Sequence, residues 1–438
     1  MTLHITYRKP EELAPRPGNP RTHTPKQIAK IARSIEAFGF TNPVLVDSAG
    51  GVIAGHGRLA AAKKLGLKQV PSICLAELSE AEVRAYVIAD NRLAEEAGWD
   101  RDLLAIEFAW LDKLNLDFDL SLTGFELPEI DIVLQEAAGA GQADAAEEVP
   151  LPSEGPAVTL PGDIWEIGCH RLICGSALDA DTYTALMAGQ AAAAAFTDPP
   201  YNVPIDGHVC GSGKVRHREF AMASGEMSAE AFTGFLATAF RHLAAASRDG
   251  AIHFHCMDWR HMTEMLAAGQ GVYSELKNLC VWAKTNGGMG SLYRSQHELV
   301  FVYKVGAGPH VNNVELGRHG RNRTNLWSYA GVNSFGGQQA DLALHPTVKP
   351  TPLVADAILD VTRRGEIVLD AFAGSGTTLL AAERTGRRGY GIELDPAYAD
   401  VIVRRREAAS GLEACLAGNG ETFASVAGRR MQAENAAA

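Results

Sequence analysis

The sequence lacks the features of a membrane, secreted or disulfide-stabilised protein. Its 438 residues include no run of about 18 consecutive apolar residues, the length that a membrane span needs. The first ten residues contain no apolar core of a signal peptide. The seven cysteines are odd in number, scattered and never spaced as Cys-x-x-Cys, which argues against a disulfide framework. These absences predict a cytoplasmic protein that does not enter a membrane.

Positive charge is also scarce. Lys and Arg number 40 against 52 Asp and Glu, for a formal net charge of -12, so the chain does not resemble a protein that coats nucleic acid non-specifically. Two local basic stretches without helical periodicity are nevertheless candidates for DNA contact, with solvated loops as the alternative. They contain Lys214, Arg216, His217 and Arg218 in the first, and Arg318, His319, Arg321 and Arg323 in the second.

One group of possible metal ligands is present, formed by Cys169, His170 and Cys174. A structural zinc site needs four ligands, usually with a second pair at a fixed spacing. No such pair follows, so the sequence predicts no metal site.

A change in composition divides the chain. Residues 136–157 are rich in Ala, Gly, Pro and acidic residues without a hydrophobic period, as in a flexible linker. The preceding part, residues 1–135, alternates short strands with helices, which predicts a small α/β domain followed by helices to about residue 114. Its strands are expected at 43–46, 51–54 and 70–74, and its first helices at 25–38 and 58–65.

The part after the linker predicts a larger α/β domain over residues 158–412. Short apolar runs alternate with amphipathic segments, which favours a mostly parallel sheet with helices on both faces. Residues 413–438 are small, polar and Ala-rich, so this tail is expected to be frayed. The clearest strands are expected at 192–197, 251–255, 279–282, 299–303 and 367–369.

A glycine-rich turn follows the last of these strands. It reads DAFAGSGTT from Asp370 to Thr378, and Gly374 and Gly376 let the backbone come close to a ligand. A second short strand ends at Glu393, where a carboxylate can accept hydrogen bonds from both hydroxyls of a ribose. A phosphate-binding loop would need a Lys after the second glycine. The two strands therefore predict a pocket for a nucleoside without a polyphosphate.

Another turn, Asp198-Pro199-Pro200-Tyr201, follows the run AAAAAFT. It therefore lies at the carboxyl end of a strand, where open α/β sheets bind ligands. The prolines fix φ and offer carbonyls without N–H groups. Asp198 and the Pro199 carbonyl can accept the two hydrogens of an amino group, while Tyr201 can stack on a base. Since a base inside a duplex cannot reach such a turn, the target has to be flipped out. A plain surface turn is the alternative.

Residues from about 160 to 408 resemble the permuted N6-adenine/N4-cytosine DNA methyltransferases, in which the catalytic motif precedes the cofactor motif. The resemblance implies a Rossmann-like sheet, S-adenosylmethionine as cofactor, and double-stranded DNA as the partner whose flipped base is methylated on an amino group. Asn202 after the catalytic turn is more similar to the adenine enzymes. The four motifs are DPPY at 198–201, HPTVKP at 345–350, DAFAGSGTT at 370–378 and GIELDPAY at 391–398.

The resemblance also implies roles for single residues. Asp198, Pro199, Pro200 and Tyr201 handle the target base. Ser176 stands where the family usually has an Asp that contacts the adenine of the cofactor. The cofactor is held by Asp370, Phe372, Gly374, Ser375, Gly376, Thr377, Thr378, Glu393 and Lys349.

Two further segments resemble parts of the same family. Residues 281–304 are similar to the hairpin that lines the target-base pocket, with Trp282, Lys284 and Glu298 in family-like places. Residues 306–344 correspond to the region that reads the DNA sequence, where Arg side chains suit guanine edges in the major groove. The expected DNA contacts are Arg318, Arg321, Arg323 and Lys284.

Residues 5–95 resemble the N-terminal domain of the chromosome-partition protein ParB, which implies a ParB/sulfiredoxin-like α/β fold. In that family a glycine-flanked basic turn that opens a helix binds the phosphates of a nucleotide, as helix N-terminal N–H groups favour anions. Gly55, His56 and Arg58 are the expected nucleotide site. A degenerate module for DNA contacts or for subunit contacts, as in a homodimer, is the alternative. The resemblance rests on Asn19-Pro20-Arg21, on GVIAGHGRLAAA at 51–62, on Leu65-Gly66 and on Val70-Pro71.

The sequence leaves three other readings of the whole chain open. An N4-cytosine DNA methyltransferase would use the same amino chemistry. An RNA methyltransferase would meet an exposed amino group without flipping a base. A partition-type DNA-binding protein could carry an inactive methyltransferase domain for targeting.

Overall fold

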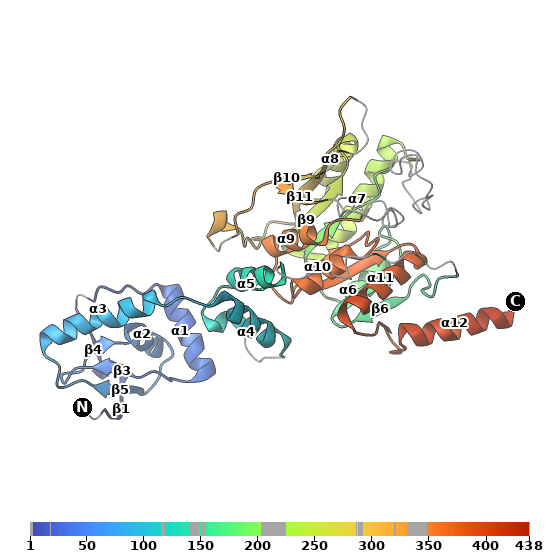
Figure 1. Ribbon diagram of the computed structural model, residues 1–438. Helices are drawn as coiled ribbons and strands as arrows, with labels where there is room; N and C mark the ends of the chain where they lie inside the picture. The colour runs from blue at the N-terminus through green and yellow to red at the C-terminus, as the bar shows by residue number, and fades with distance from the viewer. Residues whose placement is uncertain are drawn as a thin grey trace. The chain divides into compact units, whose positions relative to one another are not determined.

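The computed structural model describes residues 3–17, 19–114, 119–139, 149, 152, 155–202, 225–285, 287, 292–318, 321–330 and 348–437. The chain divides into two compact units, Met1–Gly139 and Ala140–Ala438 (Figure 1). This boundary lies within the expected linker, although helix α5 (Leu127–Gly139) continues past the residue at which the linker was expected to begin. Within the described ranges, every helix is too short or too polar to cross a bilayer.

The N-terminal unit is built on a five-stranded sheet with the order β1-β5-β3-β4-β2. Val44 and Val70 are completely buried between this sheet and its helices. Helix α1 begins where the Thr24 side chain accepts a hydrogen bond from the Gln27 amide, a standard N-cap. The elements are β1 (Ile5–Arg8), η1 (Pro10–Glu12), β2 (Ala14–Pro15), α1 (Pro25–Phe38), β3 (Val44–Val46), β4 (Gly51–Ala54), α2 (His56–Lys64), β5 (Val70–Cys74), α3 (Glu80–Glu96), α4 (Arg101–Lys113), η2 (Leu120–Thr123) and α5.

Helices α4 and α5 pack on one another around a small core of their own. Phe108 and Ile130 are buried there, and Phe125 meets the Phe108 ring edge-on at 5.3 Å between centroids. The sequence predicted helices as far as residue 114 but missed α5, because its apolar residues border the composition change that marks the linker.

The C-terminal unit contains a ten-stranded sheet with the order β12-β10-β11-β9-β8-β13-β14-β7-β6-β15. The central strands β9, β8, β13, β14 and β7 are parallel, whereas β11 inserts antiparallel between β9 and β10. The strands are β6 (Ile164–Ile167), β7 (His170–Cys174), β8 (Ala192–Thr197), β9 (Ser247–Met257), β10 (Glu275–Ala283), β11 (His297–Lys304), β12 (Leu326–Ser328), β13 (Ile367–Asp370), β14 (Arg388–Glu393) and β15 (Cys415–Leu416).

Helices cover both faces of this sheet (Figure 1). Side chains alternate along the central strands: Ala195 and Leu369 pack with α6, α7 and α8, while Phe196 and Val368 pack with α9 and α10. The expected α/β class is confirmed, as is burial of the central strands on both faces. The helical segments are α6 (Ala180–Met187), α7 (Ala229–Ala245), η4 (Trp259–His261), α8 (Met262–Gln270), η5 (Glu315–Gly317), α9 (Thr351–Val361), α10 (Thr377–Arg384), α11 (Pro396–Ser410) and α12 (Phe423–Ala437).

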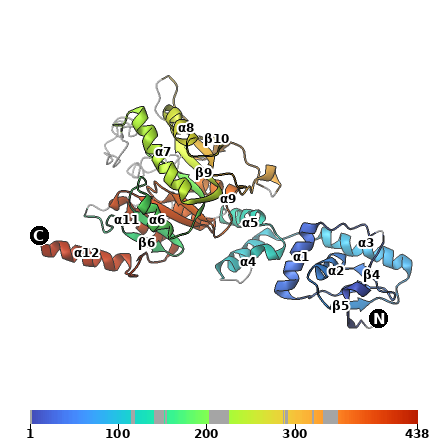
Figure 2. The same ribbon diagram turned by 180° about the vertical axis from the view of Figure 1, so that it is seen from behind.

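The tail, expected to be frayed from residue 413, is instead folded onto the sheet. Strand β15 pairs antiparallel with β6, and α12 follows on the β6 side of the unit (Figure 2). Phe423 packs edge-on against Trp165 with centroids 5.1 Å apart, and Arg430 forms an ion pair with Asp163. The expectation was wrong because a few apolar residues suffice to anchor an Ala-rich helix on a buried Trp.

Candidate active site

The catalytic turn and the glycine-rich turn lie side by side at one edge of the sheet. Strands β8 and β13 are parallel neighbours, with Ala194 opposite Val368 and Ala195 opposite Leu369. The turn that begins at Asp198 and the turn after β13 therefore leave the sheet at the same carboxyl edge. Two segments far apart in the chain thus form one site, as expected from the parallel pattern.

Both oxygens of the Asp198 carboxylate accept hydrogen bonds. The Tyr201 hydroxyl donates to Oδ1 at 2.7 Å, and the Lys349 ammonium donates to Oδ2 at 2.6 Å. Burial raises the pKa of Asp198 above its ordinary value, although the nearby Lys349 ammonium opposes the shift. The turn therefore holds a carboxylate that is a strong hydrogen-bond acceptor and has increased affinity for a proton.

Lys349, which is expected to contact the cofactor, lies between two carboxylates. Its side chain is buried, with 6% exposed, and its ammonium lies between Asp198 and Glu298, 3.0 Å from Glu298 Oε2. Lys284 pairs with the other oxygen of Glu298. Burial alone would raise the pKa of Glu298, but the two lysines outweigh it and hold that pKa at about 2. Two cations and two carboxylates thus neutralise one another beside the catalytic turn.

Aromatic rings flank this charged group. The Lys349 Nζ atom lies 5.5 Å from the centre of the Tyr201 ring and 5.9 Å from that of Trp282. The Trp282 indole donates to the Tyr329 carbonyl at 3.0 Å, which fixes the ring plane. Tyr201 is partly buried and Trp282 is only 3% exposed, so both rings pack around the ammonium close to the Asp198 carboxylate.

Two supports of the catalytic turn were not predicted from the sequence. Asn202, at φ +52°, accepts hydrogen bonds from two backbone amides and donates to the Met227 carbonyl. Thr197, immediately before Asp198, lies 2.7 Å from His255 Nδ1, and His255 Nε2 lies 2.8 Å from the Tyr273 hydroxyl. Burial lowers the pKa of His255 well below its ordinary value, so this chain of hydrogen bonds is neutral.

The second turn leaves open space next to a carboxylate. Gly374 has φ +54°, and a Cβ placed there would meet no atom closer than 3.9 Å. Its amide donates to Glu393 Oε2 at 2.8 Å, and the Asp395 amide donates to Oε1 at 2.9 Å. By contrast, a Cβ on Gly376 would lie 2.8 Å from Ile402. Gly374 therefore faces the ligand space, while Gly376 allows close packing.

The remaining residues of the expected cofactor pocket divide into two groups. Asp370 accepts from the Phe372 amide and from the Thr378 hydroxyl, so these three shape the mouth of the pocket. The hydroxyls of Ser375 and Thr377 face the buried Arg405 guanidinium and so support the turn from behind.

Ser176 lies at the edge of the same pocket. Its hydroxyl accepts from the Leu178 amide at 3.2 Å, and the preceding Gly175 amide donates to the Glu393 carbonyl at 2.9 Å. The loop that carries Ser176 is therefore tied to the end of β14, beside the Glu393 carboxylate.

Three family profiles match the chain. The N6/N4 DNA methylase profile matches residues 192–404, and the ParB N-terminal domain profile matches residues 3–91. A ParB-methyltransferase helix-turn-helix domain matches residues 102–161. The chain therefore contains an N6/N4 DNA methylase domain and a ParB N-terminal domain. The C-terminal unit is called the methylase unit below, and residues 3–91 the ParB domain.

Several known proteins are similar to parts of the chain. The ParB-like nuclease domain-containing protein YnaK of Escherichia coli (strain K12) is 48% identical over 80 residues, which cover 18% of this chain and 92% of YnaK. Type II methyltransferase M2.DpnII of Streptococcus pneumoniae is 45% identical over 64 residues, 15% of this chain and 24% of that protein. DNA adenine methyltransferase YhdJ of Escherichia coli (strain K12) is 38% identical over 86 residues, 20% of this chain and 28% of YhdJ.

The matches to these two methyltransferases thus cover less than a third of either protein. Among solved structures, the cytosine-N4-specific PvuII DNA methyltransferase aligns with a TM-score of 0.41 and 15% identity, over 60% of this chain and 93% of that chain.

S-adenosylmethionine is the cofactor of the N6/N4 methylase family, and the pocket fits it. Glu393 ends a strand beside the open space at Gly374, as ribose binding requires. Burial raises the pKa of both Asp370 and Glu393 to about 7. Since S-adenosylmethionine carries a sulfonium cation and donates two ribose hydroxyls, it binds the ionised carboxylates better than the protonated ones.

The affinity for S-adenosylmethionine is therefore expected to rise with pH. At pH 6 both carboxyls are largely protonated, and at pH 8 both are largely ionised. Binding is expected to strengthen about tenfold or more over this range, measured by isothermal titration calorimetry. Glu393→Gln should bind more weakly and show a smaller dependence on pH. A flat profile in the unsubstituted protein would show that the cofactor does not sense these carboxyls.

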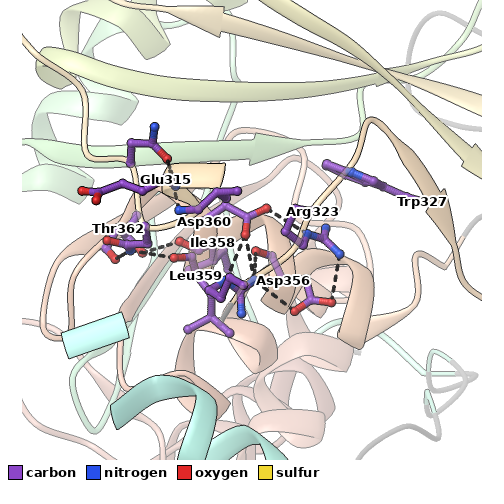
Figure 3. A network of polar contacts seen from close by, with 12 residues as sticks. Glu315, Arg323, Trp327, Asp356, Ile358, Leu359, Asp360 and Thr362 are labelled. Carbon is purple, nitrogen blue, oxygen red and sulfur yellow. Dashed lines mark hydrogen bonds and ion pairs between the residues drawn. The ribbon is translucent and has the colours of Figure 1, made fainter. Parts of the chain in front are cut away.

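Arg321 and Arg323 form a buried network with helix α9. Figure 3 shows Arg323 beside Asp356 and Asp360. Arg321 donates to Asp360 Oδ1 at 2.7 and 3.1 Å, and Arg323 donates to Oδ2 of the same carboxylate at 3.1 Å. Asp356 pairs with both arginines. Carboxylates thus already hold both guanidiniums, and the reading of bases by these two residues stays a prediction.

The other expected DNA contacts differ in their surroundings. Arg318 is largely exposed and pairs only loosely with Glu315, at 3.3 Å. Lys284 pairs with Glu298 and lies 4.7 Å from the centre of the Trp282 ring, so it is held close to the catalytic turn. Several residues of the expected sites lie outside the described residues, namely His319, residues 214–218 and residues 345–347.

The expected nucleotide site of the ParB domain opens helix α2. Gly55, at φ +100°, precedes the helix, and a Cβ there would meet the Arg58 guanidinium at 3.0 Å. Arg58 donates to the Pro43 carbonyl at 3.3 Å, while its Nε–H has no hydrogen-bond partner within the described residues. Burial lowers the pKa of His56. The turn brings a helix N-terminus, an arginine and an imidazole together.

The helix-turn-helix match places α4 and α5 in a module that the sequence reasoning had described only as trailing helices. Its elements are joined by η2, and Asp100 caps α4 by accepting from the Asp102 and Leu103 amides. A signal was present in the sequence, since an Asp cap precedes an apolar helix.

Proposed function

We propose that the methylase unit transfers a methyl group from S-adenosylmethionine to the N6 amino group of adenine in duplex DNA. The observation that supports this proposal is that the two turns follow the neighbouring parallel strands β8 and β13 and leave the sheet at the same carboxyl edge. One turn offers the buried Asp198 carboxylate and the other offers the open space beside Glu393.

The residues of the site account for the chemistry of transfer. Asp198 and the Pro199 carbonyl accept the hydrogens of the amino group, which turns the nitrogen lone pair away from the turn and toward the cofactor pocket. S-adenosylmethionine supplies an electrophilic methyl group. The N–C bond forms as the S–C bond breaks, and the amino nitrogen then loses a proton. Asp198 is suited to accept that proton because burial raises its pKa. Holding the reactants in this geometry contributes several kcal/mol, up to about 7 to 11.

Two observations favour adenine over cytosine. Asn202 stands after the DPPY turn and holds the backbone that follows it. The relative YhdJ, which is named as a DNA adenine methyltransferase, is 38% identical over its matched segment. Cytosine N4 presents the same kind of amino group and is the second candidate.

A methyl-transfer assay tests the proposal. Purified protein is incubated with tritiated S-adenosylmethionine and genomic duplex DNA, single-stranded DNA or RNA, and the product is digested to nucleosides. We expect label in N6-methyladenine from duplex DNA. Label in N4-methylcytosine would change the base, label only in RNA would change the substrate, and no label would favour a partition-type DNA-binding protein.

We further propose that the turn at Gly55, His56 and Arg58 binds the phosphates of a nucleotide. The Arg58 Nε–H, which meets no acceptor among the residues that the structure describes, and the first amides of α2 support this role, because both favour anions. Titration with ATP and CTP tests it. Arg58→Gln should abolish binding, while Arg84→Gln, on the exposed side of α3, should leave it unchanged. Equal binding by all three proteins would refute the site.

A further inference from the structure

Lys349 has two carboxylates within reach of one ammonium. Its Nζ atom is 2.6 Å from Asp198 Oδ2 and 3.0 Å from Glu298 Oε2. The Tyr201 hydroxyl donates to the other oxygen of Asp198, Oδ1. Lys349 therefore contacts the oxygen, Oδ2, to which Tyr201 does not donate. An amino group that approaches Asp198 would therefore compete with Lys349 for Oδ2.

We propose that the Lys349 ammonium holds the place of the target amino group on Asp198 and moves onto Glu298 when a base enters. This inference rests on the proposed function and assigns Lys349 and Glu298 as positioning residues for capture of the base.

The surroundings of Lys349 allow this exchange without leaving a buried charge unpaired. An isolated ammonium in a protein interior is strongly destabilising, but Glu298 is already in contact and needs only a small movement of the flexible lysine side chain. The backbone is fixed, since Pro350 follows and α9 begins at the completely buried Thr351. Only the side chain has to move.

The aromatic rings link this movement to base binding. The ammonium lies 5.5 Å from the centre of the Tyr201 ring and 5.9 Å from that of Trp282. A base that stacks on the partly buried Tyr201 ring takes up space beside the ammonium. Lys284 remains on the other oxygen of Glu298, while Oε2 already lies 3.0 Å from Lys349 and accepts from the Tyr201 hydroxyl at 3.2 Å.

The exchange also serves the chemistry of transfer. While Lys349 contacts Asp198, it keeps that carboxylate ionised and thus able to accept a hydrogen bond. When Lys349 has moved away, the proton affinity of Asp198 increases. This increase comes at the stage when the methylated nitrogen has to release its proton, so that an N–H bond breaks and an O–H bond forms on Asp198.

The test uses binding to a short oligodeoxyadenylate, whose bases are unpaired, so that it does not depend on turnover. Glu298→Gln keeps the shape of the side chain but gives Lys349 a weaker alternative to Asp198, and the affinity is expected to fall about tenfold. Lys349→Met removes the competitor and should bind at least as tightly as the unsubstituted protein. The double variant should resemble Lys349→Met, which is non-additive behaviour typical of coupled residues.

Two further measurements separate this coupling from a loss of structure. All variants should bind S-adenosylmethionine as the unsubstituted protein does, and Glu298→Asp, which keeps the charge, should restore most of the affinity for the oligodeoxyadenylate. Equal weakening by Glu298→Gln and Lys349→Met, or no weakening by either, would overturn the inference. Absence of methyl transfer in the unsubstituted protein would instead refute the proposed function.

Discussion

Replacing Asp198 by alanine is expected to lower methyl transfer about a thousandfold or more while the affinity for S-adenosylmethionine stays within a few-fold of its original value. The reason is geometric. Asp198 contacts Tyr201 and Lys349, whereas the cofactor pocket is formed by the separate turn at Gly374 and by Glu393. Transfer is measured with tritiated cofactor on duplex DNA, and affinity by calorimetry.

A matched control is available at the same edge of the sheet. Asp258 follows strand β9, next to β8; it caps the short helix η4 by accepting from the Arg260 amide and pairs with the Arg260 guanidinium at 3.6 Å. Asp258→Ala should therefore retain transfer within a few-fold. Asp198→Asn adds a second comparison, because it keeps the shape of the side chain but loses the charge that pairs with Lys349. Loss of cofactor binding together with transfer in Asp198→Ala would indicate that the carboxylate supports folding rather than chemistry.

The arrangement of the two turns could be predicted from the sequence because it depends on local patterns and on one general rule. The run before Asp198 and the run before Asp370 both form strands that are buried on both faces, which indicates a parallel sheet. Parallel strands bring their carboxyl ends to one edge, and ligands bind there. No knowledge of side-chain packing is needed for this step.

The partners of single charged residues could not be predicted in the same way. Lys349 and Asp198 are 151 positions apart, and nothing in a lysine next to a proline indicates which carboxylate it will meet. The same is true of Arg321 and Asp360, which are 39 positions apart. Local composition suggested basic side chains in a loop, whereas their burial depends on helix α9 and is visible only after folding.

Breaking the network around Asp360 is expected to produce the second large effect. Arg321→Met should destabilise the methylase unit by about 3 kcal/mol, because it removes one partner from a buried group of charges. Of the two arginines in this network, Arg323 alone then remains to pair with the α9 carboxylates Asp356 and Asp360. Calorimetry of the full chain should show a lower transition temperature for this unit, by roughly 6 °C.

The matched control is Arg318→Met, three positions away. Arg318 is largely exposed and pairs with an exposed Glu315, so its loss should change the free energy of unfolding by no more than about 0.5 kcal/mol. The same pair of variants separates the two roles that Arg321 could have. A structural role lowers stability and leaves the choice of DNA sequence unchanged.

A role in reading bases would give the opposite pattern, with altered site choice at unchanged stability. The network also fixes the wall of the base pocket, since Arg323 donates to the Tyr329 hydroxyl at 2.8 Å and the Tyr329 carbonyl accepts from Trp282. Arg321→Met is therefore expected to slow transfer at every DNA sequence by a similar factor. Uniform slowing is expected because a displaced wall of the proposed base pocket affects the target base itself and not the bases that flank it.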